Sequence, residues 1–133
     1  MINGVIYMHR IADGKVEGGT RRIIKLLQEL FGSTDLRRVV IVTTWWDKVD
    51  GKLAVERETQ LRDGKSLFKP MLTAGAKMMR HEMRHDQGFS SAQRVLNHLL
   101  RLNTLDLEIQ AQLVKDEKIR TERHFFLRWL RFF

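Results

Sequence analysis

The sequence predicts an α/β fold in three layers, with a mainly parallel sheet between helices. Two short apolar segments carry this prediction. Gly4–Met8 is apolar, and Val39–Thr44 consists entirely of β-branched residues. Because neither segment alternates with polar residues, both are typical of strands that are covered on two faces. A helical pattern separates them, and this order favours a parallel pair joined by a right-handed crossover.

The first two helices are expected from apolar spacing and from their end residues. Thr20 is expected to cap the first helix, and Gly32 stands where a helix commonly ends with glycine. One face of this helix would carry Ile23, Ile24, Leu27, Leu30 and Phe31. The polar segment Glu56–Lys77 is also expected to be helical, with a kink or a break at Pro70.

The C-terminal part is expected to add a strand and two helices. Lys77–Met83 is a candidate third strand, and Ser90 and Ser91 are candidate caps of the helix that follows. That helix would carry Val95, Leu96, Leu99 and Leu100 on one face. A separate last helix would carry Leu105, Ile109, Leu113 and Val114.

The composition limits the classes of protein to which this chain can belong. With 133 residues, of which 43% are hydrophobic, it fits one globular domain with a real core. It contains no Cys, which excludes disulfides and thiolate chemistry. No apolar run is long enough to span a bilayer, and residues 1–8 lack the basic flank of a signal peptide, so we expect a cytoplasmic protein. The net charge of +8 is expected to form a solvated basic surface, with no specific nucleic-acid partner.

Candidate chemistry lies where the second predicted strand ends, at Thr44-Trp45-Trp46-Asp47. Ligands of open α/β sheets bind beyond the carboxyl ends of the strands. A carboxylate at Asp47 can accept two N–H donors from a flat heterocycle, and guanine presents such a pair along one edge. In the alternative interpretation, Asp47 caps the next helix or turn and the two Trp side chains simply pack.

Several segments also occur in the order of a known family. They are Gly4–Ile11, Val39–Val49, Lys69–Leu72, Ser91–Ala92 and Glu108–Val114. Over residues 4 to 121 the chain resembles fungal G-domain-containing proteins, which are P-loop GTPase-like and distantly similar to septins and AIG1-type GTPases. The resemblance implies that residues 1–121 correspond to the second half of a P-loop GTPase domain and that residues 122–133 form a basic aromatic tail.

The resemblance also implies a role for each site residue. The strand end would be a T-x-x-D version of the N-K-x-D motif that recognises the base. Asp47 would hold the guanine edge, Thr44 would tether neighbouring loops, and Trp45 would lay its indole against the base. Ser91 and Ala92 would belong to the later loop whose backbone N–H meets the guanine oxygen.

The phosphate-binding part of such a domain is missing from this sequence. The nearest string to G-x-x-x-x-G-K-[ST] is Gly64-Lys65-Ser66, but Thr59 stands where the first glycine is needed. GTP and Mg²⁺ are therefore implied for a complete family member, whereas this chain alone is expected to need no cofactor. We expect guanine-nucleotide binding that is weak at most, and no hydrolysis unless another chain or an upstream segment supplies the phosphate site.

His81-Glu82-Met83-Arg84-His85 matches the zinc motif H-E-x-x-H. The motif requires a helix, so that both His side chains share one face. The third ligand position of the longer metzincin pattern is Ser91, and Lys77 and Arg80 add positive charge nearby. In the family resemblance this segment is a strand and its loop, so we expect no metal site here.

The C-terminal tail combines basic and aromatic residues. If it is helical, one face would carry Phe125, Phe126, Trp129, Leu130 and Phe133. Three roles are open: the tail folds back onto the core, packs against another subunit, or lies on an anionic membrane surface. The first predicted strand would also present an unpaired edge, because the strand that flanks its equivalent in a full G domain is absent. We therefore expect self-association, and the alternative function is a non-enzymatic interaction or membrane-surface protein.

Overall fold

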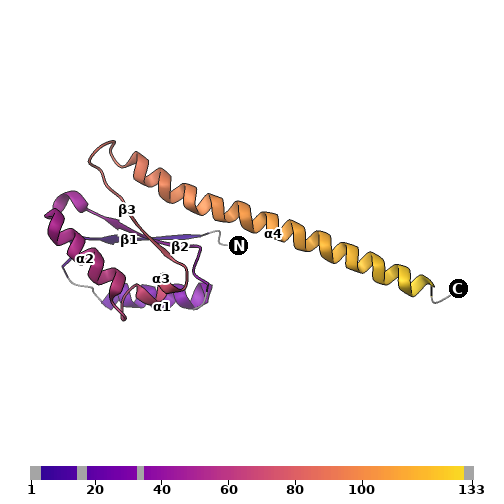
Figure 1. The fold of residues 1–133 in the computed structure, drawn as a ribbon. Coiled ribbons are helices and arrows are strands. Elements are labelled where there is room, and N and C mark those ends of the chain that lie inside the picture. Colours follow the sequence, from indigo (N-terminus) through magenta and orange to yellow (C-terminus); the bar gives the residue numbers. More distant parts are fainter. Residues whose placement is uncertain (1–3, 15–17, 33–34, 131–133) are drawn as a thin grey trace. The chain divides into compact units, whose positions relative to one another are not determined.

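A computed structural model describes residues 4–14, 18–32 and 35–130 of the chain. The elements, in chain order, are β1 (Val5–Arg10), α1 (Gly18–Phe31), β2 (Val39–Thr44), the 3₁₀ turn η1 (Trp46–Lys48), α2 (Gly51–Asp63), α3 (Lys69–Thr73), β3 (Lys77–Arg80) and α4 (Phe89–Leu130) (Figure 1). The chain divides into two compact units, Met1–Leu99 and Leu100–Phe133, whereas the sequence placed its boundary after residue 121.

The three strands form one parallel sheet in the order β1-β2-β3. Val5 lies opposite Val39 in the first pair, and Val40 lies opposite Lys77 in the second. The expectation of an α/β fold with adjacent parallel strands is therefore confirmed. The central strand β2 has every residue buried, as its unbroken β-branched sequence predicted.

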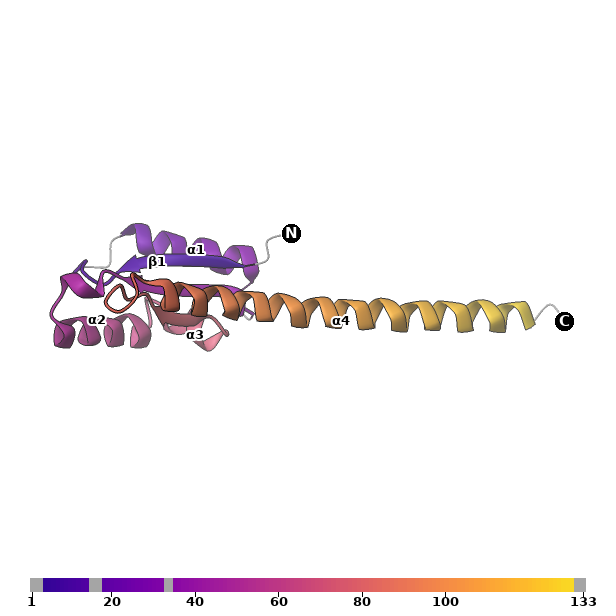
Figure 2. The same cartoon turned by 90° about the horizontal axis from the view of Figure 1, so that it is seen from above.

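Helices cover both faces of β2, because its alternate side chains point in opposite directions. Val39 and Ile41 belong to a core with side chains of α1, α2 and α3. Val40 and Val42 pack on the other face against Val95 in the first turns of α4. Figure 2 shows α1 running alongside β1. The first unit is thus a helix–sheet–helix sandwich with the cores on either side of β2.

The helices differ from the sequence prediction in four respects. The first helix, α1, begins at Gly18, so Thr20 lies inside it and not at its cap. Glu56–Lys77 does not form one helix: α2 begins earlier, and the break falls before Pro70, which occupies the first turn of α3. Proline is favoured there because the first-turn N–H groups have no helical partner. Ser90 and Ser91 lie inside α4 rather than at its cap, and the Asp86 side chain accepts the Ser90 N–H at 2.9 Å.

The prediction of two separate C-terminal helices is also wrong, because α4 runs without interruption over 42 residues. No Gly or Pro occurs between Phe89 and Leu130, so nothing in the backbone chemistry ends it. The predicted apolar face of the tail falls in this region. The backbone is helical as far as Leu130, but the side chains of that face, and the whole of Phe133, lie outside the described residues. In the described part of the chain, no helix is both long and apolar enough to cross a membrane.

The deepest side chain of the larger core provides a test of this packing. Phe68 is fully buried, and its ring centroid lies 6.0 Å from those of both Tyr7 and His9. Phe89 is 69% exposed. We expect Phe68→Ala to lower the free energy of unfolding by about 3–5 kcal/mol, because a large buried ring leaves a cavity. We expect Phe89→Ala to change it by less than about 0.5 kcal/mol, since an exposed substitution leaves no cavity. Urea denaturation of both variants measures the difference, and equal midpoints would contradict the described core.

Candidate functional site

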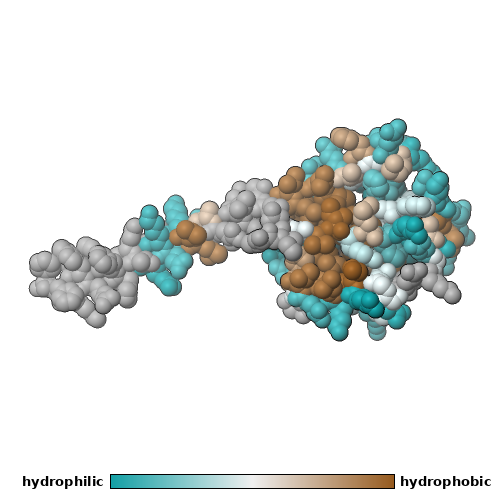
Figure 3. Space-filling view, turned by 180° about the vertical axis from the view of Figure 1, so that it is seen from behind, coloured by the Kyte–Doolittle hydropathy of each residue, from teal (hydrophilic) through white to brown (hydrophobic). Residues whose placement is uncertain are grey.

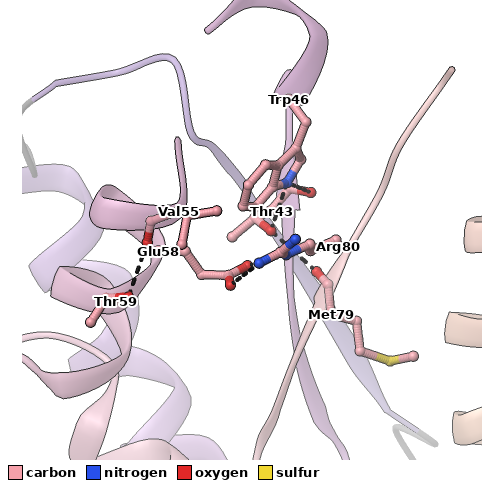
Figure 4. A network of polar contacts seen from close by, with 7 residues as sticks. All are labelled: Thr43, Trp46, Val55, Glu58, Thr59, Met79 and Arg80. Carbon is pink, nitrogen blue, oxygen red and sulfur yellow. Dashed lines mark hydrogen bonds and ion pairs between the residues drawn. The ribbon is translucent and has the colours of Figure 1, made fainter. Parts of the chain in front are cut away.

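The carboxyl end of β2 is held by a network of hydrogen bonds to its neighbours (Figure 4). The indole Nε1 of Trp46 donates to the Thr43 hydroxyl at 3.0 Å and to the Thr43 carbonyl at 3.2 Å. The Thr43 hydroxyl in turn donates to the Met79 carbonyl of β3 at 3.4 Å. The indole is therefore fixed against the strand end by its polar atom.

An ion pair lies beside this indole and joins α2 to β3. The guanidinium of Arg80 donates two hydrogen bonds to the Glu58 carboxylate, at 2.8 and 2.7 Å. The same guanidinium lies 4.3 Å from the ring centroid of Trp46, within the range of a cation–π contact. Glu58 is only 7% exposed, and its hydrogen bonds raise the pKa of Arg80. The pair therefore links α2 to β3 beside Trp46, which follows β2 directly.

A cleft of about 210 Å³ opens beside this cluster. Its walls come from η1, α2, the end of β3 and the β3–α4 loop, residues 81–88. It is lined by Trp46, Asp47, Gly51, Val55, Arg80, Glu82, Met83, Arg84 and His85. We call it the strand-end cleft. Ordinary ligand pockets have volumes of about 300–1,000 Å³, so this cleft suits a single ring system rather than a larger ligand.

Asp47 is the residue of the predicted site that lines the strand-end cleft. Its side chain is exposed, and it makes no hydrogen bond or ion pair with the described part of the chain. The cap of α2 is instead Asp50, whose side chain accepts the Leu53 N–H. The alternative in which Asp47 caps the next helix therefore does not apply, because Asp50 holds that position.

Thr44 and Trp45 take other positions at the same strand end. The buried Thr44 hydroxyl donates to the His9 carbonyl at 3.4 Å and so ties β2 to β1. Trp45 adopts a left-handed backbone with φ 65°, which is uncommon outside glycine. Its ring is 49% exposed and lies 4.9 Å from the Arg10 guanidinium, on the β1 side. The strand-end cleft thus has Trp46, one position later than predicted, as its aromatic wall.

Ser91 and Ala92 lie in the first turns of α4, not in a loop. The Ser91 hydroxyl donates to the Gly88 carbonyl at 3.1 Å, lies 2.8 Å from His81 Nδ1 and accepts the Glu82 N–H at 3.3 Å. The Ala92 N–H is bonded to the Gly88 carbonyl. Neither residue lines the strand-end cleft. Their contacts instead hold the β3–α4 loop, which forms one of its walls.

The H-E-x-x-H string falls in the same loop. His81 follows β3 directly, and residues 81–88 are not helical, so His81 and His85 do not share a helical face. Within the ranges that the structure describes, no three His, Asp or Glu side chains are grouped so that they could hold a metal ion.

Two partners in the cluster were not predicted from the sequence. Arg80 and Glu58 are 22 positions apart and meet only because α2 packs beside β3. Glu58 shares the buried face of α2 with Ala54 and Leu61, at the spacing i, i+4, i+7, but a carboxylate there gives no sign of its partner in β3. The sequence marks two adjacent Trp residues at the strand end as equally good candidates, and only the structure shows that Trp46 is the one in the cleft.

Comparison of the chain with models of protein families, with curated proteins and with solved structures found no match. The assignment of a function therefore rests on the geometry of the strand-end cleft and on the chemistry of its residues.

The β3–α4 loop depends on a glycine that can be tested. Gly88 has φ +85°, and a Cβ there would overlap the His81 ring and lie 2.8 Å from the Met83 sulfur. Gly32 has a similar φ of +82° with nothing within 4 Å of its Cβ position. We expect Gly32→Ala to lower the free energy of unfolding by about 1–2 kcal/mol through backbone strain alone. Gly88→Ala should cost about 1–3 kcal/mol more, because the methyl group also displaces the loop.

Thermal unfolding monitored by circular dichroism compares the two glycine variants. Tryptophan fluorescence of the folded Gly88→Ala protein should also change, since the displaced loop lies across the cleft from Trp46. Equal losses of stability in the two variants would mean that the loop is not packed as described.

Proposed function

We propose that this chain is the base-recognising half of a P-loop GTPase-like domain, and that the strand-end cleft binds a guanine base. The observation that carries the proposal is the exposed, unpaired carboxylate of Asp47, which lines a ring-sized cleft at the carboxyl end of the central strand. This is the end of a parallel sheet at which α/β proteins bind ligands.

The chemistry of the cleft suits guanine. The base carries an N–H and an exocyclic amino group side by side, and one carboxylate accepts from both, as Asp47 is free to do. The carbonyl oxygen of guanine lies on the adjoining edge and needs a donor. Arg84 and His85 line the same cleft and carry N–H groups for this purpose. Trp46 lines the same cleft, and the part of its ring that Arg80 does not cover is a flat apolar surface against which a base can stack.

The topology supports the same interpretation. The parallel order β1-β2-β3 places the end of β2 beside the segment that follows β3. The family resemblance assigns to the base the end of β2, at Thr44–Asp47, and Ser91-Ala92 beyond β3. We assign the donor on the second segment to the β3–α4 loop and not to Ser91 and Ala92, because the Ser91 hydroxyl and the Ala92 N–H are already bonded to that loop.

Binding is expected to be weak, and hydrolysis is not expected from this chain alone. The sequence lacks G-x-x-x-x-G-K-[ST], which supplies the N–H groups and the Lys that hold the phosphates. The base contacts remain, and hydrogen bonds to a charged group contribute about 1.5–3 kcal/mol each. A dissociation constant near 1 mM corresponds to only about −4 kcal/mol, which such contacts can provide.

Asp47→Asn tests the base contact directly. We expect the variant to bind GTP at least about 10-fold more weakly, because an amide cannot accept from both guanine donors. Its amide N–H should instead improve binding of xanthosine triphosphate, which has a carbonyl where guanine has the amino group. Saturation-transfer NMR and calorimetry measure both nucleotides in the same buffer.

Asp63→Asn serves as the matched control for this experiment, since Asp63 is exposed at the end of α2 and does not line the strand-end cleft. It should bind GTP like the original protein. GTP binding that Asp47→Asn leaves unchanged would disprove base recognition at this site. Hydrolysis of GTP by the purified chain would disprove the proposed loss of the phosphate site.

A further inference from the structure

The free edge of β1 carries unpaired main-chain groups. Within the described residues β1 is paired with β2 alone and lies at the end of the sheet. The N–H groups of Val5 and Ile11 donate toward β2, at 2.8 and 2.9 Å. Because these directions alternate along a strand, the N–H and C=O groups of Ile6 and Met8 point away from it. No Lys, Pro or bulge protects this edge between Val5 and His9, as edge strands of monomers usually require.

Apolar side chains flank this edge on the face of the sheet that α4 covers. Ile6 and Met8 lie beside Val40 and Val42 in the register, but they remain 41% and 60% exposed. On the neighbouring helix, Leu96 is 54% exposed. Thus α4 covers β2, whereas the equivalent side chains of β1 remain open to solvent.

The other face of the edge is flanked by a second apolar stripe. Ile23, Leu26 and Leu30 follow the helical spacing i, i+3, i+7 along α1, which runs beside β1 (Figure 2). Leu26 is 47% exposed and Leu30 is 58% exposed. The view from behind shows the resulting block of hydrophobic surface (Figure 3). A monomer rarely leaves a strand edge and both of its flanks apolar at once.

We propose that a second copy of this chain covers the edge by antiparallel β1–β1 pairing about a two-fold axis at Tyr7. Ile6 of each copy then lies opposite Met8 of the other. These are the residues whose main-chain groups point outward, so each such pair exchanges both of its hydrogen bonds. The three-stranded sheet becomes one continuous sheet across the axis.

A second copy is the occupant that this geometry favours, because it offers the same unpaired edge and the same apolar flanks. A two-fold axis normal to the sheet keeps the faces in register, so the α1 stripe of one copy meets the same stripe of the other, as in isologous dimers. The register places Arg10 opposite Gly4 of the second copy, and no like charges meet. From Val5 to His9 the edge contains no Lys, Arg, Asp or Glu, so the net charge of +8 on each copy places no such charge within this segment.

The strand-end cleft plays no part in this contact, because none of its lining residues belongs to β1, α1 or α4. The proposed dimer and the proposed base site can therefore be tested independently, and either one can be wrong without the other. GTP should not change the mass of the particle, and loss of the dimer should not change nucleotide affinity.

Ile6→Lys tests the interface, and Leu53→Lys on α2 is its matched control. The two side chains are 41% and 40% exposed, so both substitutions are tolerated by the fold. Sedimentation equilibrium of the full chain should give a dimer for the original protein and for Leu53→Lys. Ile6→Lys should raise the dimer dissociation constant by more than about 30-fold, because its ammonium would be buried without a partner. Circular dichroism checks that both variants are folded.

Two results would overturn the proposal. The first is an original protein that stays monomeric over a 100-fold range of concentration up to the highest one measured. The second is an oligomer that Ile6→Lys leaves unchanged. The second result would place the interface elsewhere on the chain.

Cysteine cross-linking tests the register, because the chain contains no natural Cys. Hydrogen-bonded antiparallel partners have Cα atoms about 5.5 Å apart, within the range of a disulfide. An equimolar mixture of the Ile6→Cys and Met8→Cys variants should therefore form a covalent dimer on mild oxidation, at several times the yield of either variant alone. A yield from Ile6→Cys alone that equals the yield of the mixture would overturn the Tyr7-centred register.

Discussion

The burial of β2 on both faces is the constraint on which the rest of the first unit depends. All six residues of this strand are inside the protein, and four of them are fully buried. A strand of this kind needs a helix layer on each side and a neighbour on each edge. The crossovers through α1 and through α2–α3 provide these, since parallel neighbours cannot be joined by tight turns. Because β2 is immobilised in this way, the chain that leaves its carboxyl end has a fixed starting point, and Asp47 has a fixed position.

The cluster of Arg80, Glu58 and Trp46 connects the buried strand β2 to elements nearer the surface. The Arg80–Glu58 pair connects β3 to α2, and Trp46 lies against the guanidinium and hydrogen-bonds to β2. A half-buried ion pair gains less in net stability than its short distances suggest, because both charges lose hydration. Its stronger effect is on geometry: it holds α2 to the end of β3, and residues of both elements line the strand-end cleft.

At β1 the requirement for cover on both faces and both edges is not met. Parallel sheets are stable when both faces and both edges are covered, and β1 has one edge and part of one face open. The apolar side chains there are those of a strand that belongs inside a sheet, not at its end. The proposed pairing of two β1 strands would complete the sheet without using any residue of the strand-end cleft. Association and ligand binding would then be separate properties of one small domain.

Some of this structure could be read from single segments of the sequence. Val39–Thr44 can hardly be anything except a buried strand, because six β-branched residues disfavour a helix and contain no polar alternation. Gly32 ends α1 with φ +82°, as a glycine at that position predicts. Asp47 could be singled out for a similar reason, since a carboxylate directly after a buried strand falls where α/β sheets bind ligands.

Other features were decided only by the tertiary structure. Local sequence could not distinguish Trp45 from Trp46, because the choice depends on which indole reaches Thr43 and Arg80. It could not show that Ser91 is held by His81 and the β3–α4 loop, since those contacts span nine to ten positions. The ion pair between Glu58 and Arg80 could not be predicted either, because the two residues are 22 positions apart. Side-chain composition therefore predicts which segments are buried. Which side chains line the cleft depends instead on the packing of α2 against β3, because that packing brings together residues that are far apart in the sequence.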